Sequence, residues 1–365
     1  MKSKETAIIT YESQAGSGNE IWLRITAFLS LKSANTQRTY ASVISEWCHF
    51  LGAEAGTERA AKLLITAPDI SAIAYRANLE KKLGQKPRYQ VSKPSSQSKS
   101  KALLKFSAKK EKRDGMQSTL ANATIRKKIA ALRRIYRMLL SADLGLRINP
   151  FDTDRIPPPS ALSGQKRPTE MVEFKLVQKI ISLPNEMLDK GLRDKAVLAI
   201  LFGGGLRRSE AVGLRINDVR SSMHGTVFLN LRATKSKRDF DQALPRWSAD
   251  IVKKLVNNRK AQGAKEGDFL FISYRGKGGN IPTATPLSDS GVYKLFKYYC
   301  IKAGAGNFVT PHSARATAIT KLLEDGLSHR EVQEFSRHAS VQMVEVYDKR
   351  RISVDESAAK DLKYD

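Results

Sequence analysis

The stretch TPHSARATAITKLL, residues 310–323, has the features of a helix whose beginning faces a negatively charged group. Thr310 is a favourable N-cap, and Pro311 fits the first helical position. His312 and Arg315 are three residues apart, so both share one surface and are expected in the first turn. Backbone N–H groups there are unpaired and the helix dipole is positive. This end therefore predicts an anion site, such as one for a phosphate.

The overall charge also indicates a polyanionic partner. The 365 residues include 63 Lys and Arg against 36 Asp and Glu, a formal net charge of +27 at pH 7. Such an excess repels itself in a folded chain unless a polyanion neutralises it. Nucleic acid is the first candidate and an anionic membrane surface the second. No apolar run reaches the roughly 18 residues that a membrane-spanning helix needs, so we expect no membrane segment.

The cysteines and histidines form neither a metal pattern nor a disulfide framework. Cys48 and Cys300 are the two cysteines, both in segments with helical periodicity, and the five histidines do not cluster with them. We therefore expect no metal and no cofactor. Residues 1–13 lack the apolar core of a secretory signal, so a reduced, cytoplasmic location is the simplest expectation.

The first part of the chain, residues 20–155, has a helical pattern. Helices are predicted within 34–56, 71–84 and 122–145, where apolar residues recur at helical spacing. The face opposite the apolar stripe of 122–145 is almost entirely positive, with Arg126, Lys127, Lys128, Arg133, Arg134 and Arg137. A solvated face usually mixes charges of both signs. These six residues are therefore predicted to contact DNA phosphates, with an ordinary solvated face as the alternative.

Two stretches interrupt this pattern. Residues 85–117 are rich in Lys, Ser and Pro and nearly free of acidic residues. This composition is typical of a disordered loop, and equally of a flexible basic arm that folds onto a phosphate backbone. Residues 156–170 contain three consecutive prolines flanked by Gly and Ser, which resist regular structure. We therefore predict a first domain over 1–155, a linker over 156–170 and a second domain over 171–365.

The second domain is predicted to be mixed. Helices are expected at 173–183, 190–204, 208–214, 248–262, 288–303, 311–325, 328–336 and 340–348. Residues 225–245 alternate apolar and polar side chains and predict a small group of strands. The fold class is therefore mainly α, with a small β-sheet in the second domain.

Five places in this second domain hold residue types that phosphoryl transfer uses. They are Arg207 with Glu210 in GGGLRRSE, Lys235 and Lys237 in TKSK, the pair His312 and Arg315, then His338, and finally Tyr347. Each has an ordinary explanation by itself: an intrahelical ion pair, a solvated hairpin tip, a local hydrogen bond or packing. Their combination is what points to chemistry, because arginine forks match phosphate oxygens and a tyrosine needs cations and a base to become a nucleophile.

In this order and spacing, the residues resemble the tyrosine recombinases, the family of phage-type integrases and Xer-type resolvases. The resemblance rests on the Gly-Leu-Arg-x-x-Glu around Arg207, a hairpin lysine, His312-x-x-Arg315, and His338 followed nine residues later by Tyr347. It covers the second domain and extends loosely to residues 35–51 and 122–140. The resemblance implies an α-helical core-binding domain that clamps DNA and a mixed α/β catalytic domain.

The resemblance also implies roles for the main residues. Tyr347 would attack a DNA phosphodiester and form a 3′-phosphotyrosyl link with a free 5′-hydroxyl. Arg207 and Arg315 would hold the two non-bridging oxygens of that phosphate, and Glu210 would orient Arg207.

The remaining roles concern protons and one departure from the family pattern. His312 would manage the tyrosine proton, Lys235 would protonate the leaving 5′-oxygen with Lys237 as its rival, and His338 would hydrogen-bond the phosphate.

Ser336-Arg337 stands where family members usually have a small apolar residue followed by glycine. Arg337 therefore needs room, or itself reaches a phosphate.

The partners implied by the resemblance are double-stranded DNA recombination sites. Family members of this build assemble as homo-tetramers on paired sites, sometimes with accessory DNA-bending proteins, and residues 352–365 would dock on a neighbouring subunit. The short stretch before the first helix is expected to be too small for a separate arm-binding domain. The favoured role is the integrase of a mobile element. A chromosome or plasmid dimer resolvase, a type IB topoisomerase-like enzyme and a non-enzymatic DNA-binding protein are the alternatives.

Overall fold

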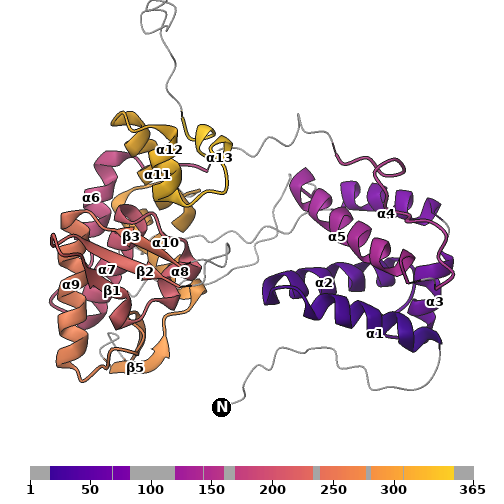
Figure 1. Ribbon diagram of the computed structural model, residues 1–365, viewed down its shortest axis with the longest axis horizontal. Helices are drawn as coiled ribbons and strands as arrows, with labels where there is room; N and C mark the ends of the chain where they lie inside the picture. Colours follow the sequence, from indigo (N-terminus) through magenta and orange to yellow (C-terminus); the bar gives the residue numbers. More distant parts are fainter. Residues whose placement is uncertain are drawn as a thin grey trace, which may run out of the picture. The chain divides into compact units, whose positions relative to one another are not determined.

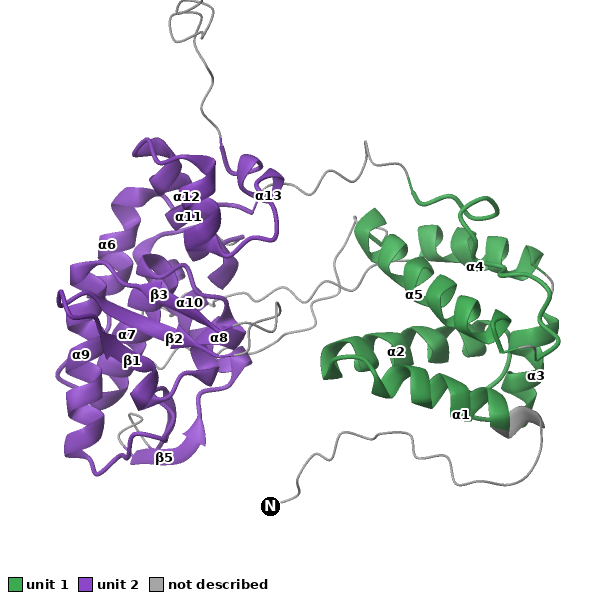
Figure 2. Cartoon of the chain, viewed as in Figure 1, with its two compact units in different colours: residues 1–165 green, residues 166–365 purple. Residues whose placement is uncertain are grey.

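The computed structural model describes residues 17–67, 69–82, 120–142, 144–159, 169–232, 239–276, 281–306 and 308–348. The chain divides into two compact units, residues 1–165 and 166–365, which are described separately (Figure 2). The basic segment 85–117, the candidate lysines Lys235 and Lys237, and the tail 352–365 lie outside the described residues.

Unit 1 is a helical domain (Figure 1). Its helices are α1 (Ser17–Ser30), α2 (Ala34–Phe50), α3 (Glu58–Thr66), α4 (Ile70–Lys81) and α5 (Asn122–Leu140). The apolar stripes of these helices meet in one core. At its centre the Trp47 indole N–H donates a hydrogen bond to the Tyr136 hydroxyl at 2.9 Å. The rings of Tyr75 and Phe151 contact Trp47 edge-on, which gives the core a specific aromatic packing.

Unit 2 combines helices with two small antiparallel sheets. Its helices are α6 (Phe174–Ser182), α7 (Asp189–Gly203), α8 (Arg208–Gly213), α9 (Arg246–Ala261), α10 (Asp289–Ala303), α11 (Pro311–Glu324), α12 (His329–Ser336) and α13 (Gln342–Glu345), with a 3₁₀ turn η1 (Ile216–Asp218). One sheet has the order β1 (Val219–Ser221), β2 (Val227–Leu231) and β3 (Phe240–Ala243), and the other pairs β4 (Ile272–Arg275) with β5 (Ile281–Pro286).

Helix α7 is the centre of unit 2, and its burial explains the apolar run AVLAILF within it. Every residue from Ala196 to Phe202 is buried. Helices α9 and α11 pack against α7. The chain then turns sharply at Gly205, whose φ of +56° suits glycine and where a Cβ would lie 2.9 Å from the Phe335 ring. This turn brings Arg207 out of the core toward α11 and α12.

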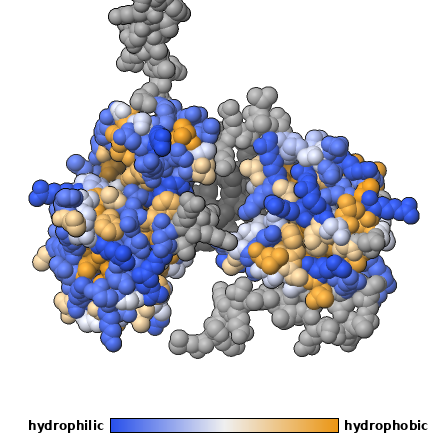
Figure 3. Space-filling view, in the orientation of Figure 1, coloured by the Kyte–Doolittle hydropathy of each residue, from blue (hydrophilic) through white to orange (hydrophobic). Residues whose placement is uncertain are grey.

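A smaller cluster joins the last three helices. Ile319, Leu323, Val332 and Val344 are buried together, from α11, α12 and α13, and Tyr347 packs against them. The surface of both units in the view of Figure 3 is mainly hydrophilic, with apolar residues in scattered patches. Among the helices that the structure describes, none is both long and apolar enough to cross a membrane.

Candidate active site

Arg207 is held at the start of α8 by a carboxylate one turn further on. The Arg207 backbone N–H donates to Glu210 Oε2 at 2.8 Å, and Arg207 Nη1 donates to Oε1 at 2.7 Å. The Glu210 side chain is 9% exposed and that of Arg207 29% exposed. The carboxylate therefore fixes one edge of the guanidinium from inside, and part of the guanidinium remains accessible.

Arg315 approaches the same place from α11 and is fully buried. Its Nη1 donates to the Gly205 carbonyl oxygen at 2.7 Å, whereas its Nε and Nη2 have no hydrogen-bond partner among the described residues. Arg315 is the fifth residue of α11, so it lies in the second turn and not in the first turn, where we expected it. His312 lies in the first turn and is exposed.

His338 follows the end of α12 and is mostly buried. Its Nδ1 lies 3.0 Å from the Ser336 hydroxyl. Burial, and after it the charges of Arg315 and Arg207, lower the pKa of His338 to about 4. The imidazole is therefore neutral at pH 7. When the Ser336 hydroxyl donates to Nδ1, the ring proton is on Nε2, which becomes a hydrogen-bond donor.

Tyr347 lies just beyond the short helix α13. Its ring stacks on that of His338, with centroids 5.9 Å apart and planes 8° from parallel. Its backbone N–H donates to the Val344 carbonyl at 2.8 Å, and Asp348 Oδ2, on the next residue, lies 2.9 Å from His329 Nε2 at the start of α12. These contacts hold the half-buried phenol beside the imidazole.

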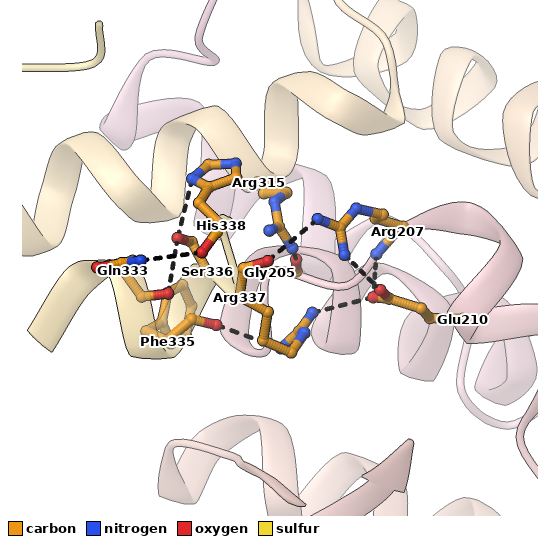
Figure 4. A network of polar contacts seen from close by, with 9 residues as sticks. All are labelled: Gly205, Arg207, Glu210, Arg315, Gln333, Phe335, Ser336, Arg337 and His338. Atoms are coloured by element: carbon orange, nitrogen blue, oxygen red, sulfur yellow. Dashed lines mark hydrogen bonds and ion pairs between the residues drawn. The ribbon is translucent and has the colours of Figure 1, made fainter. Parts of the chain in front are cut away.

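Arg337 completes the cluster and is the residue that the motif did not assign. Arg337 Nη2 donates to Glu210 Oε2 at 2.9 Å, so two arginines share one carboxylate (Figure 4). Burial, followed by Arg207 and Arg337, lowers the pKa of the Arg315 guanidinium to about 9. Two guanidinium groups thus pair with one carboxylate while the charge of a third, Arg315, also acts on it, and the positive excess favours a bound anion. The only sequence signal for Arg337 was its departure from the family's usual glycine.

The six basic residues predicted on α5 fall into two groups. Lys127, Arg134 and Arg137 are exposed. The other three are partly buried and bound within unit 1: Arg126 donates to the Pro159 carbonyl, Lys128 pairs with Glu46, and Arg133 donates to the Phe151 and Ile156 carbonyls. The side chains of the exposed group are accessible to a partner, and their contact with DNA phosphates stays a prediction.

Two further observations concern metal ligands and the lysines. Within the described ranges, no three His, Cys, Asp or Glu side chains come together as a metal site. Lys235 and Lys237 are outside those ranges, so the lysine position stays a prediction. The described cluster consists of arginines, histidines, one carboxylate and one phenol, which are groups that bind and cleave phosphate esters without requiring a metal.

Comparisons with known proteins identify the family of the chain. The profile of the phage integrase family matches residues 170–352. Tyrosine recombinase XerD of Lacticaseibacillus casei is 27% identical over 238 residues, covering 63% of this chain and 73% of that protein. Tyrosine recombinase XerC of Bacillus subtilis (strain 168) is 28% identical over 238 residues, covering 64% and 72%.

A solved structure shares the fold. The XerH site-specific recombinase bound to palindromic difH substrate, in a post-cleavage complex, superimposes with a TM-score of 0.50 at 20% identity, over 62% of this chain and 64% of that chain. The predicted fold class, mainly α with a small sheet, is confirmed, as is the resemblance to the tyrosine recombinases. The chain therefore belongs to the phage integrase family and is a site-specific DNA recombinase of the tyrosine type.

Proposed function

We propose that Tyr347 cuts one DNA strand by attacking a backbone phosphodiester, and that the chain is the integrase of a mobile element. The observation that carries the cleavage proposal is the buried Arg315, with two guanidinium nitrogens that lack partners among the described residues. A buried donor without an acceptor is costly. A phosphate oxygen would supply that acceptor. The charges of Arg207 and Tyr347 act on Arg315, and the Tyr347 ring stacks on that of His338.

The proposed reaction is a balanced ester exchange. The Tyr347 phenol oxygen bonds to phosphorus while the bond from phosphorus to the 5′-oxygen breaks. The product is a 3′-phosphotyrosyl link and a free 5′-hydroxyl. His312 accepts the phenol proton, and Lys235, or its rival Lys237, gives a proton to the leaving oxygen. Because one phosphate ester replaces another, a 5′-hydroxyl from a second strand can reverse the step and join a new partner.

The positive groups act on the charge that builds up on the phosphate. Arg207 and Arg315 bind its non-bridging oxygens, and fork-like guanidinium groups match that geometry. The neutral His338 donates a hydrogen bond through Nε2, provided that Ser336 donates to Nδ1. Donors arranged in advance where charge develops contribute a few kcal/mol each, typically about 3–4.

The proposal is tested by trapping the covalent link. The protein is incubated with a pool of nicked duplexes. Cleavage close to the nick releases a short fragment, and its loss prevents religation. The flanking sequence is randomised so that the pool does not depend on a known target site. We expect adducts that survive denaturation and carry DNA on Tyr347, together with none from Tyr347→Phe. A Tyr347→Phe protein that still forms adducts would contradict the assignment, as would a folded, DNA-binding wild type that forms none.

The biological role has two candidates, both with paired DNA sites as substrate. Membership of the phage integrase family supports integration of a mobile element. The names XerD and XerC of two relatives favour the resolution of chromosome or plasmid dimers. We infer that a homo-tetramer pairs two sites, with accessory DNA-bending proteins where the sites require bending. Sites recovered from the adduct pool, placed in one plasmid or two, distinguish resolution from integration. Relaxation of a plasmid without recombinant products would indicate topoisomerase activity.

A further inference from the structure

Arg337 has a backbone conformation that its own side chain disfavours. It follows α12 with φ 54° and ψ 40°, in the left-handed region. Among the described residues it is the sole non-glycine residue with positive φ. Glycine would take this conformation without the cost of about 1–2 kcal/mol that a Cβ brings. A non-glycine residue with this backbone conformation beside a site motivates the hypothesis that its side chain has a function there.

The side chain of Arg337 is directed into the protein. It is 3% exposed, and its Nη1 donates to the Phe335 carbonyl at 3.2 Å. Its Nη2 donates to Glu210 Oε2 at 2.9 Å. The same carboxylate accepts both hydrogen bonds of Arg207 described above, so the two oxygens of Glu210 are shared between two arginines (Figure 4).

This sharing joins two separate segments of unit 2. Glu210 and Arg207 lie at the start of α8, whereas Arg337 lies 127 residues further along the chain, at the end of α12. The Arg337 segment leads directly to His338 and on to Tyr347. The ion pair therefore connects the segment that carries a phosphate-binding arginine with the segment that carries the nucleophile.

We propose that Arg337 is a positioning residue. Its guanidinium holds Glu210, and Glu210 in turn keeps Arg207 in a fixed position relative to the segment that carries His338 and Tyr347. The inference rests on the DNA cleavage proposed above. Arg337 acts through Glu210: its Nη1 and Nη2 are engaged by the Phe335 carbonyl and by the Glu210 carboxylate, whereas Nη2 of Arg315 has no partner among the described residues.

The charge state of Glu210 offers a second readout. Burial alone would raise the pKa of Glu210, but Arg337 and Arg207 outweigh burial and hold it below its usual value. Arg315 on α11 also faces this carboxylate. Removal of the Arg337 charge raises the pKa of Glu210. Since the charged carboxylate holds Arg207, cleavage should then fail at a higher pH as the solution is acidified.

Three substitutions separate charge from backbone conformation. Arg337→Lys keeps the charge and the Cβ, Arg337→Gln keeps the Cβ alone, and Arg337→Gly loses both but relieves the backbone. We expect adduct formation from the nicked-duplex pool in the order wild type, Lys, then Gln and Gly, the last two lower by about tenfold to a hundredfold. Thermal stability of Arg337→Gly should equal or exceed that of Arg337→Gln, which excludes misfolding as the cause.

A double-mutant cycle with Glu210→Gln tests whether Arg337 acts through Glu210. We expect Arg337→Gln to have little further effect on adduct formation in the Glu210→Gln protein, because coupled residues are not additive. The acid limb of the cleavage pH profile should move to higher pH in Arg337→Gln and Arg337→Gly, while Arg337→Lys restores it. Arg330→Gln, at an exposed position of α12, is the matched control and should cleave like the wild type.

The possible failures are distinguishable. Wild-type rates in Arg337→Gly, or full additivity in the cycle, would overturn the positioning role while leaving Tyr347 cleavage intact. A loss of DNA affinity with a salt dependence lower by about one phosphate contact would show that Arg337 binds DNA directly. A folded, DNA-binding wild type that forms no adduct would overturn both proposals.

Discussion

The guanidinium of Arg315 combines full burial with two nitrogens that have no partner among the described residues. Such an unmet donor costs about 1–3 kcal/mol. The neighbouring charges of Arg207 and Arg337 add repulsion, which is one reason why its pKa falls to about 9. An anion in the site relieves both penalties together. At the scale of single residues, the protein thus holds an unfavourable arrangement, which the proposed binding of a phosphate would relax.

Replacing Arg315 or Arg207 with alanine should separate binding from chemistry. Each change removes charge stabilisation from the transition state, so adduct formation should fall by about a hundredfold or more. Duplex affinity should change little, because each change removes one charge from a chain with a formal net charge of +27. Gel-shift titration and the nicked-duplex assay measure the two properties. Arg208→Ala is the matched control, since Arg208 pairs with Asp289 instead. Equal losses of affinity and cleavage would indicate a role in binding alone.

The motif named the candidate residues of the site but not how they contact one another. The types and order of Arg207, His312, Arg315 and Tyr347 are visible in the sequence. The burial of Arg315 and the pairing of Arg337 with Glu210 depend on packing between α8, α11 and α12, and so have no local signature. The ionic contact of Arg337 spans 127 residues, a separation at which periodicity carries no information.

At the scale of elements, α5 shows that one charged face can serve two purposes. Two of its basic residues donate hydrogen bonds to backbone carbonyls of unit 1, a third pairs with Glu46, and the other three are exposed. The inner group bonds to the segment 151–159 and to α2, so it fixes how the end of unit 1 packs. The outer group, Lys127, Arg134 and Arg137, makes none of these contacts and is the group that we predict to bind DNA phosphates.

Neutralising the outer group should weaken DNA binding without unfolding unit 1. In the triple variant Lys127→Gln, Arg134→Gln and Arg137→Gln, the slope of log affinity against log salt should fall by about 2–3, near 0.9 for each lost phosphate contact. Binding titrations over a salt series measure this slope. By contrast, Arg133→Gln leaves buried carbonyls without a donor and should lower the free energy of unfolding by about 1–3 kcal/mol. An unchanged salt slope in the triple variant would assign those residues to a solvated face.

Strong helical periodicity predicted the long elements well. Helices α2, α5, α7 and α11 all lie where apolar residues recur at helical spacing. The separate helices α1 and α3 were not individually predicted. In the case of α3, the helix is short and its apolar face is made largely of alanines such as Ala60 and Ala61. The β4–β5 pair was also missed. Strand β5 is mostly exposed and contains Pro282 and Pro286, so it lacks the alternation that marks a strand.

At the scale of the whole molecule, each unit has its own hydrophobic core. The core of unit 1 is centred on Trp47, and that of unit 2 on α7. Two of the three tryptophans, Trp22 and Trp47, lie in unit 1 and the third, Trp247, is partly exposed in unit 2. This distribution allows the unfolding of the two cores to be followed separately.

We expect the two units to unfold in separate transitions. In a Trp247→Phe background, fluorescence reports on unit 1 while circular dichroism reports on both units. Leu132→Ala, in the core of unit 1, should shift the fluorescence transition, with a loss of about 2–5 kcal/mol. Leu198→Ala, in the core of unit 2, should leave that transition in place and shift the other. One shared transition that moves with either substitution would show that the units unfold together.

All the described groups assigned to bond breaking lie in unit 2, between Arg207 and Tyr347. The basic face of α5 lies in unit 1. Substitutions on α5 can therefore change the predicted phosphate contacts of unit 1 while the proposed chemistry of unit 2 is inherited unchanged.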